Sequence, residues 1–315
     1  MDMLMKNILS ICNTHYHPLL NLQNVVGVGL GFKYTNYINT NKPCIHVLVN
    51  QKVNCDCLCK NSIIPKKHKG ILTDVIDVGN ITQLSDSLPK KYRPLEGGCS
   101  ISAVASVKGS GTLGCIVEKK VNGKKDYYIL SNNHILAGNN VNSKGTHIIQ
   151  PTYEHGGKDK TDVIATLSDY VEIKFINGSS EPENFADCAI AKITDPSFIS
   201  DKIAIINDGI EDVDIAKLEE RVKKVGFVSG LTTGKVISQS VTMTVDCHVG
   251  HTTKKALFKN QKISSLHSMP GDSGSIVLNH SNEAVGLLWG GSSKAGVFSE
   301  IKYVLSQLKV NIINT

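Results

Sequence analysis

The stretch SLHSMPGDSGSIVL, residues 265–278, places Ser273 between two glycines and ahead of an apolar run. A serine hydroxyl is a weak nucleophile near neutral pH, and it becomes reactive when a nearby base takes its proton. Gly271 lacks a Cβ, so it can form a sharp turn that aims its own N–H and that of Ser273 at one point. Paired donors of this kind stabilise an oxyanion. The stretch therefore predicts either a catalytic serine or a polar residue in a tight hairpin turn.

One competing serine motif is the nucleophile elbow of the α/β-hydrolases. That motif reads G-x-S-x-G, but position 275 of this chain is serine. The elbow also leads directly into a helix and has its histidine after the serine. Here the run SIVL that follows is typical of a strand. The sequence therefore argues against an elbow.

Two upstream segments carry candidate partners for Ser273. In YYILSNNHILAG (127–138), His134 ends an apolar strand, and in ENFADCAIAKI (183–193), Asp187 opens an alternating one. The order histidine, aspartate, serine belongs to the chymotrypsin arrangement and to neither the subtilisin nor the hydrolase arrangement. Asp162 and Asp169 are weaker candidates for the carboxylate because they lack the apolar strand that follows Asp187. The ordered set favours catalysis over the structural interpretation of each residue alone.

On these residues the chain resembles the trypsin/chymotrypsin-like serine peptidases, and bacterial trypsin-like members in particular. LSNNHIL resembles the family's histidine segment, with Asn132 and Asn133 where small residues are usual. DCAIAKI resembles the aspartate segment, and GDSGS the serine segment, with Ser275 in place of a second glycine. VGFVSGLTTGKV (225–236) and AVGLLWGGSSKAGVFSEI (284–301) resemble the start of the second barrel and the hairpin beside the specificity pocket. The resemblance covers about residues 95–312.

The resemblance implies a mainly β fold with two antiparallel six-stranded barrels and the site between them. We expect a peptidase domain over residues 91–315. Within it, the first barrel spans about 95–200, the second about 222–300 and a C-terminal helix about 299–310. His134 would be the general base and then the general acid, Asp187 would orient it, and the N–H groups of Gly271 and Ser273 would form the oxyanion hole.

The specificity pocket implied by the resemblance departs from trypsin. Its base would be His267, six residues before the serine, with Ser268 beside it. Cleavage after Arg or Lys requires an acidic group at that depth, so we expect an acidic or small polar P1 residue instead. Trp289, Gly290 and Gly296 would line the remaining walls.

The N-terminal segment differs in character from the rest. The runs NVVGVGLGFKY, CIHVLVNQKV and GILTDVIDVG predict strands, and we expect a small α+β domain over residues 1–90. In GVGLGF the glycines are 27, 29 and 31 and position 32 is Phe, so the dinucleotide fingerprint is not met. No activation sequence precedes PLEGGCSIS (94–102), so either Asp272 has a partner other than a freed N-terminus or the protein matures differently. Residues 1–90 are expected to regulate the site as a propeptide or as a docking domain.

Elsewhere the pattern is of short apolar or alternating runs separated by Gly, Asn and Ser, which is typical of an all-β protein. Two segments predict helices. IEDVDIAKLEERVKK (210–224) has high helix propensity. SEIKYVLSQLKV (299–310) has apolar residues at helical spacing after a serine that can cap it.

Composition bounds the remaining possibilities. The chain has 315 residues, a formal charge of +6 and dispersed lysines, which favours solvated loops over a nucleic-acid surface. Nine cysteines without a regular framework argue against a disulfide-stapled domain. Cys55, Cys57 and Cys59, with His68 nearby, could bind zinc, but their spacing is unusual for zinc and free thiols are expected. The sequence shows no signal peptide or membrane span, so a cytoplasmic protein is expected.

The function expected from these observations is a serine endopeptidase that hydrolyses peptide bonds through an acyl-enzyme. Triad chemistry needs no metal or nucleotide, so no cofactor is expected. Partners would be protein or peptide substrates and a regulator acting through residues 1–90, not nucleic acid or membrane. Two alternatives stay open. One is a silent scaffold or binding module, and the other is a protease that acts only on one partner or on itself.

Overall fold

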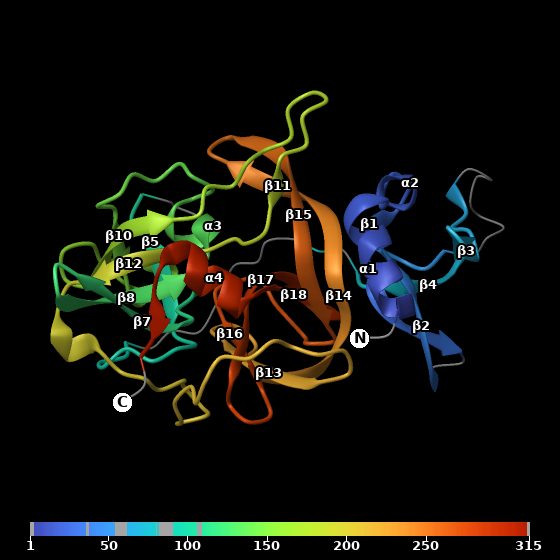
Figure 1. The fold of residues 1–315 in the computed structure, drawn as a ribbon. Coiled ribbons are helices and arrows are strands. Elements are labelled where there is room, and N and C mark those ends of the chain that lie inside the picture. Colours follow the sequence, from blue (N-terminus) through green and yellow to red (C-terminus); the bar gives the residue numbers. More distant parts are fainter. Residues whose placement is uncertain are drawn as a thin grey trace.

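The chain forms two β-sheets that lie side by side, with the N-terminal strands attached to the outer edge of the second (Figure 1). The structure is a computed structural model that describes residues 3–35, 38–53, 62–79, 81, 91–105 and 109–313. The expected mainly β architecture, with two barrel-like sheets and a C-terminal helix, is confirmed.

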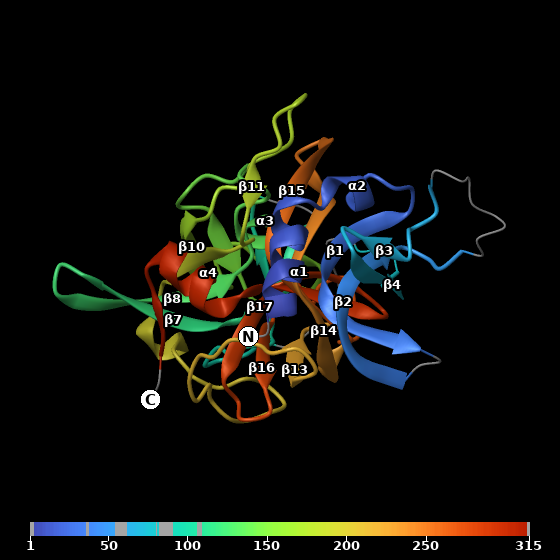
Figure 2. The same ribbon diagram turned by 45° about the vertical axis from the view of Figure 1, so that its right-hand side comes forward.

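The first sheet surrounds an apolar core that includes Ile101, Ile129 and Leu167. Its strand order is β19-β7-β8-β12-β10-β9-β5-β6. The β7–β8 hairpin projects from the sheet (Figure 2) and turns at Asn122 and Gly123, both with positive φ. This turn chemistry suits a two-residue hairpin. The strands are β5 (Ser100–Ala103), β6 (Ser110–Thr112), β7 (Cys115–Val121), β8 (Lys124–Ser131), β9 (His147–Ile149), β10 (Val163–Tyr170), β12 (Ala189–Ile193) and β19 (Asn311–Ile312). Short helices connect them: α3 (Asn133–Leu136), η3 (Tyr153–His155) and η4 (Pro196–Phe198).

The second sheet closes into a ring. The order β15-β18-β17-β16-β13-β14 returns to its start because β14 also pairs with β15, which gives the expected six strands. Its interior holds Val236, Val285 and Phe298. The strands are β11 (Glu183–Asn184), β13 (Arg221–Gly226), β14 (Gly230–Val249), β15 (Thr252–Ser264), β16 (Ile276–Asn279), β17 (Ala284–Ser292) and β18 (Ala295–Glu300).

The N-terminal strands continue this second sheet. β1 pairs antiparallel with β14, and the order runs on through β2 and β4 to β3. Helix α1 packs on the junction, where Ile8 and Ile11 meet Val28 and Leu257. The predicted strands at 24–34, 44–53 and 70–79 are confirmed in type. The elements are α1 (Met3–Thr14), α2 (His17–Leu20), β1 (Val25–Thr35), β2 (Ile38–Val49), β3 (Lys67–His68) and β4 (Ile71–Asp77).

The glycines of GVGLGF are packing residues within β1. A Cβ on Gly31 would lie 2.0 Å from Cε1 of His46, and one on Gly29 would lie 2.6 Å from a methyl of Val241. Only glycine fits where strands and ring approach this closely. The run therefore owes its composition to tight packing between β2 and β14.

The C-terminal helix α4 (Ile301–Leu308) joins the two sheets. Its apolar face, with Val304 and Leu308, packs in one cluster with Val117 of the first sheet and Leu287 of the second. The helix predicted over 299–310 is confirmed, but its cap is not Ser299. Glu300 occupies the N-cap, and the Ser299 hydroxyl instead bonds Gln261.

The helix predicted over 210–224 is wrong. Residues 210–220 form no helix, and β13 begins at Arg221. β13 pairs with β14 and β16, and its alternation buries Val222 and Lys224 and turns Arg221 outward. Strand pairing in the barrel therefore overrides the helix propensity of the segment.

The cysteines within the described ranges are free and buried: Cys12, Cys44, Cys99, Cys115, Cys188 and Cys247. Burial raises the pKa of Cys99 and Cys247 to about 12. Cys55, Cys57 and Cys59 lie outside the described residues. Among the helices that the structure describes, none has the length and apolar character needed to cross a membrane.

Candidate active site

His134 and Asp187 meet where two strands of the first sheet end. β8 stops at Ser131, which pairs with Ala189 of β12, so the residues just beyond them face one another. The His134 Nδ1 and an Asp187 carboxylate oxygen are 2.5 Å apart, and the His134 backbone N–H donates to the other oxygen at 3.2 Å. Both residues are buried. This geometry fixes the imidazole ring and directs Nε2 away from the carboxylate.

The two asparagines before His134 hold this arrangement in place. Asn132 donates to the backbone carbonyl of Asp187 at 2.7 Å. Asn133 donates to Asn140 and to the carbonyl of Val171, both at 2.7 Å. Asn132 therefore ties the histidine turn to the aspartate segment, and Asn133 ties it to the segments of Asn140 and Val171.

The Ser273 turn is pinned to the first sheet by Thr112. The Thr112 N–H donates to the Ser273 carbonyl and its hydroxyl donates to the Gly271 carbonyl, both at 2.7 Å. Gly271 and Gly274 have φ of +105° and +99°, in the region that favours glycine. A Cβ on Gly274 would also lie 2.1 Å from the Thr112 carbonyl oxygen. Ser275 fits in place of a second glycine because its hydroxyl folds back onto the Asp272 carbonyl.

Several polar atoms of His134 and of the Ser273 turn are left without partners among the described residues. Among the described residues, Nε2 of His134 has no hydrogen-bond partner although it is buried. The backbone N–H groups of Gly271 and Ser273 likewise donate to none of the described atoms. The Ser273 hydroxyl donates to the carbonyl of Trp289 at 3.1 Å. Within the described part of the chain, the buried nitrogen and the two N–H groups are thus available to a bound molecule.

Asp272 has the internal partner that the sequence left unidentified. Its carboxylate lies 2.7 Å from Nζ of Lys224, and both side chains are fully buried. Further donors are the Ser229 hydroxyl and the backbone N–H groups of Val228, Ser229 and Met269. A Cβ on Gly226 would lie 2.2 Å from this carboxylate, so glycine makes room for it. Burial lowers the pKa of Lys224, and Asp272 opposes that shift.

The predicted pocket residues are all buried except His267, which is exposed. Ser268 is buried beside Gly296, where a Cβ would lie 3.1 Å from the Ser268 hydroxyl. His267 is exposed, and its Nδ1 lies 3.1 Å from the Ser293 carbonyl. Trp289 is also buried, with its ring stacked on Phe258. Gly290 lies in β17 opposite Val297 of β18.

The two weaker carboxylate candidates have partners elsewhere. Asp162 pairs with Lys91 at 2.6 Å, and that ammonium group holds its carboxyl pKa below the usual value. Asp169 pairs with Lys144 at 2.8 Å at the surface. The carboxylate at the histidine is that of Asp187.

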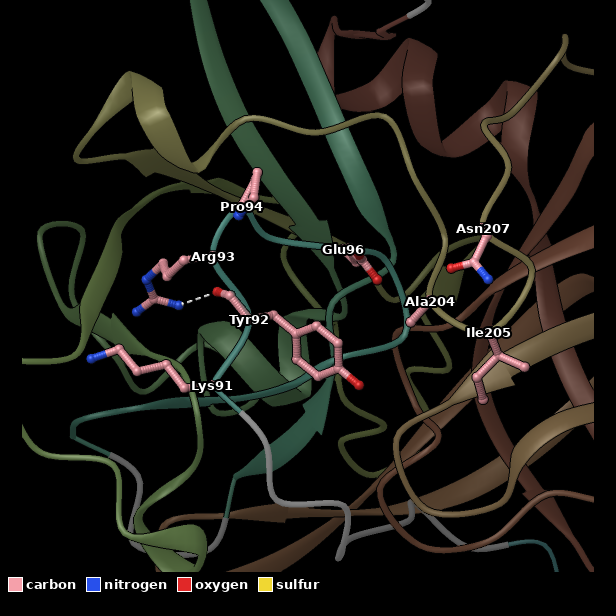
Figure 3. Close-up of a pocket in the computed structure, with 8 residues that line it drawn as sticks. All are labelled: Lys91, Tyr92, Arg93, Pro94, Glu96, Ala204, Ile205 and Asn207. Carbon is pink, nitrogen blue, oxygen red and sulfur yellow. Dashed lines mark hydrogen bonds between the residues drawn. The ribbon is translucent and has the colours of Figure 1, made fainter.

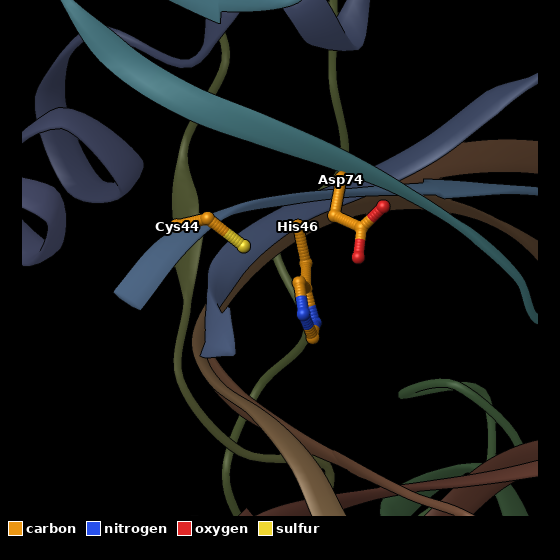
Figure 4. Close-up of side chains that lie close together, drawn as sticks. All are labelled: Cys44, His46 and Asp74. Atoms are coloured by element: carbon orange, nitrogen blue, oxygen red, sulfur yellow. The ribbon is translucent and has the colours of Figure 1, made fainter. Parts of the chain in front are cut away.

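Cys44, His46 and Asp74 form a second cluster, between β2 and β4 (Figure 4). Their ligand-type atoms lie within 4.8 Å of one another. However, both ring nitrogens of His46 have partners, the Ser238 hydroxyl at 2.6 Å and the Phe32 carbonyl at 2.8 Å. Asp74 accepts from Lys33 and from the N–H of Tyr34. These hydrogen bonds fit a structural junction better than a metal site, because a metal would have to displace them.

Two cavities lie apart from these residues. One of about 390 Å³ lies between segments 91–96 and 204–207, with Tyr92 and Glu96 directed into it (Figure 3). The other, of about 650 Å³, lies on β13 and β14 beside Arg221 and Lys235. Neither is lined by His134, Asp187 or Ser273.

The fold is that of the trypsin/chymotrypsin-like serine proteases. The Nocardiopsis protease superposes with a TM-score of 0.50 at 15% identity, covering 70% of this chain and 98% of that one. Protease A of Thermobifida fusca gives 0.48 at 16% identity with the same coverage. At such identities the likeness is one of fold alone, and the expected kinship with bacterial members stays a prediction.

The sequence itself belongs to the NARROW LEAF 1 family. The model of the NARROW LEAF 1 N-terminal domain matches residues 3–79, and that of the Nal1 C-terminal domain matches residues 81–306. Protein NARROW LEAF 1 of Oryza sativa subsp. japonica is 25% identical over 318 residues, which cover 89% of this chain and 53% of the rice protein. The chain thus spans about half the length of this relative.

Sequence reasoning missed Lys224, Thr112 and Gln261. Lys224 carried a usable signal, since RVKKVG alternates and puts Val222 and Lys224 on one face. Thr112 and Gln261 had no local signal, because each acts on residues far away in the chain.

Proposed function

We propose that this protein is a serine endopeptidase in which His134, Asp187 and Ser273 form the catalytic triad. The observation that carries the proposal is the set of polar atoms that His134 and the Ser273 turn leave unpaired among the described residues. They are the buried Nε2 of His134 and the N–H groups of Gly271 and Ser273. Unpaired buried polar atoms are costly, so their occurrence on the histidine and serine segments alike favours a site built for a ligand.

In the proposed reaction the Ser273 hydroxyl leaves the Trp289 carbonyl and turns to His134. Its oxygen attacks the carbonyl carbon of the peptide bond while Nε2 of His134 takes its proton. Asp187 stabilises the imidazolium, and the N–H groups of Gly271 and Ser273 donate to the oxyanion. His134 then gives the proton to the leaving amine, which leaves an acyl group on Ser273. Water, activated by His134, releases the acid and restores the serine.

Labelling with a fluorophosphonate probe tests this proposal. The wild-type chain should form an adduct at Ser273, identified by mass spectrometry of the modified peptide, and Ser273→Ala should form none. An adduct confined to another residue, or no adduct on the folded wild-type chain, would refute the proposal that the protein is a serine endopeptidase.

The burial of Ser273 favours a second candidate, a scaffold that does not cleave. Its side chain is 0% exposed, and its hydroxyl bonds Trp289 instead of the histidine. A scaffold would stay unlabelled at all probe concentrations. A protease in a closed resting state would label slowly but to completion.

Residues 1–90 are proposed as a regulatory unit and residues 91–315 as the peptidase domain. The Ser292 hydroxyl donates to the Val78 carbonyl at 2.6 Å, and Lys294 pairs with Asp77 at 3.0 Å. The unit thus contacts the β17–β18 turn, close to the predicted pocket. Lys294→Glu places a second negative charge beside Asp77 and leaves the pairing of β1 with β14 intact. If the unit holds the pocket closed, this variant should label faster than wild type, and equal rates would contradict regulation through this contact.

The substrates are proposed to be proteins or peptides with an acidic or small polar P1 residue. The support for this preference is that His267 is the residue expected at the base of the pocket. Its exposed ring bonds the Ser293 carbonyl, so the preference rests on its place in the sequence. Digestion of a peptide library would decide, and cleavage after Arg or Lys would refute it.

A further inference from the structure

Gln261 lies in β15, outside the predicted triad, and is completely buried. Its oxygen accepts hydrogen bonds from Nε1 of Trp289 and from the Ser299 hydroxyl, both at 2.8 Å. Its nitrogen donates to the carbonyls of Phe185 at 3.0 Å and Lys259 at 2.6 Å. The amide therefore uses its full capacity of two donors and two acceptor sites.

These bonds reach both halves of the candidate site. Phe185 lies two residues before Asp187, on the segment that brings the carboxylate to the histidine. Trp289 lies on β17 of the second barrel, and its carbonyl accepts from the Ser273 hydroxyl at 3.1 Å. Gln261 is thus one hydrogen bond away from the segment of Asp187 and one from the residue that holds Ser273.

The chemistry of the side chain suits a link of this kind. An amide is neutral, so its burial carries no charge penalty, and it donates and accepts at once. A carboxylate would lack the two donors. An apolar side chain would leave the Trp289 indole, the Ser299 hydroxyl and two carbonyls unpaired in the interior. Trp289 adds rigidity because its ring stacks on Phe258 with centroids 4.7 Å apart.

We propose that Gln261 is a positioning residue that sets the distance and orientation between Asp187–His134 of the first barrel and Ser273 of the second. This inference rests on the proposed peptidase function. Gln261 touches neither substrate nor reacting atoms and acts through Phe185 and Trp289. Misplacement of reacting groups by about 1 Å can cost on the order of 100-fold in rate.

Gln261→Met tests the proposal because methionine keeps the length of the side chain and removes the amide. The maximal rate of Ser273 labelling by the fluorophosphonate should fall about 10- to 100-fold, with little change in the probe concentration at half-maximal rate. Gln150→Met is the matched control: Gln150 is also completely buried, and it bonds Arg93 and the Tyr92 N–H in the first barrel. The control should label within about twofold of wild type when compared at equal folded fraction. Equal labelling of Gln261→Met and wild type would overturn the inference.

A second readout separates this inference from the proposed function. Trp289 is the single tryptophan of the chain, so its emission reports the Gln261 hydrogen bond without any catalysis. In Gln261→Met we expect shifted emission and faster amide exchange over residues 183–188, with neither change in Gln150→Met. An unlabelled wild type would refute the peptidase. In that case, unchanged emission and exchange in Gln261→Met would overturn the positioning role, and the expected changes would support it.

Should Gln261→Met fail to fold, Trp289→Phe removes the indole donor from the other end of the same link. It should slow labelling in the same sense, with exchange over 183–188 staying close to wild type because the Phe185 bond is kept. Labelling at the wild-type rate would overturn the inference.

Discussion

His46 and His134 are both buried, both lie close to a serine or an aspartate, and differ in the atoms that they leave unused. His46 bonds the Ser238 hydroxyl through Nδ1 and the Phe32 carbonyl through Nε2. His134 bonds Asp187 through Nδ1, and its Nε2 has no partner among the described residues. By residue type alone, the His46–Ser238 pair looks like the more complete serine–histidine couple.

The difference shows that unpaired atoms distinguish a candidate site from a structural junction. The His46 ring is enclosed by Gly31, where even a methyl group would clash, and both nitrogens are satisfied. Nothing there remains to accept a proton from a nucleophile or to bind a ligand. Among the described residues, His134 leaves one buried nitrogen unpaired, and the Ser273 turn leaves two N–H groups unpaired.

The largest expected effect is the loss of activity in Ser273→Ala. Removal of a triad serine costs about 10⁶-fold in turnover, so cleavage and probe labelling should both disappear. Ser238→Ala is the matched change at the other histidine and should keep the wild-type labelling rate. Loss of labelling in Ser238→Ala at unchanged stability would place the chemistry at His46 and reverse the comparison.

The second-largest effect is expected at the carboxylate of Asp187. Asp187→Asn keeps the shape of the side chain but removes the charge that stabilises the imidazolium, and the turnover should fall about 10⁴-fold. Asp162→Asn, at a carboxylate paired with Lys91, is the control and should leave turnover within about twofold of wild type. If the two variants lose activity equally, Asp187 has no special role.

The sequence predicted the candidate triad because each motif is local. A histidine after an apolar strand, an aspartate before one and a serine between glycines can each be recognised in a few residues. The same holds for β1, β2 and β4, whose apolar runs predict strands. Their attachment to β14 was not predictable, because β1 and β14 lie some 200 residues apart and the register depends on packing, such as that of Gly29 on Val241.

The failed helix and the missed Lys224 have one cause. Over 210–224 the local propensity favours a helix, but β13 is required between β14 and β16 to close the barrel. That strand buries an ammonium group whose partner, Asp272, lies 48 residues later. A charged residue at an interior strand position is the signal that a local analysis discards.

The third-largest effect is expected on stability, when the buried ion pair between Lys224 and Asp272 is broken. Lys224→Met leaves the Asp272 carboxylate buried without its ammonium partner, and we expect a loss of about 3–5 kcal/mol in the free energy of unfolding. Lys192→Met breaks an exposed pair with Asp126 and should cost at most about 1 kcal/mol. Urea unfolding of the two variants measures both values. Similar losses would show that burial does not make the Lys224–Asp272 pair more important for stability than an exposed pair.

The smallest expected effect is a pH dependence that originates at His46. Burial lowers its pKa below 6.5, and the charge of Lys33 acts in the same direction. The Phe32 carbonyl, Asp74 and Glu219 act in the opposite direction without cancelling the effect of burial. Below pH 6.5 the unfolded chain therefore binds a proton at this position that the folded chain does not. Stability from His46 should be complete above that pH and decline as the pH falls below it.

His46→Gln isolates this contribution because the two chains differ at this position alone. Its uncharged amide can still bond Ser238, so the variant should lose less stability than wild type as the solution is acidified. Urea unfolding at a series of pH values on both sides of 6.5 gives the difference. A constant difference across the series would mean that His46 takes up a proton in the folded state as readily as in the unfolded one. Its closed set of hydrogen bonds would then not keep the ring from taking up a proton, and the contrast with His134 would rest on the unpaired atoms alone.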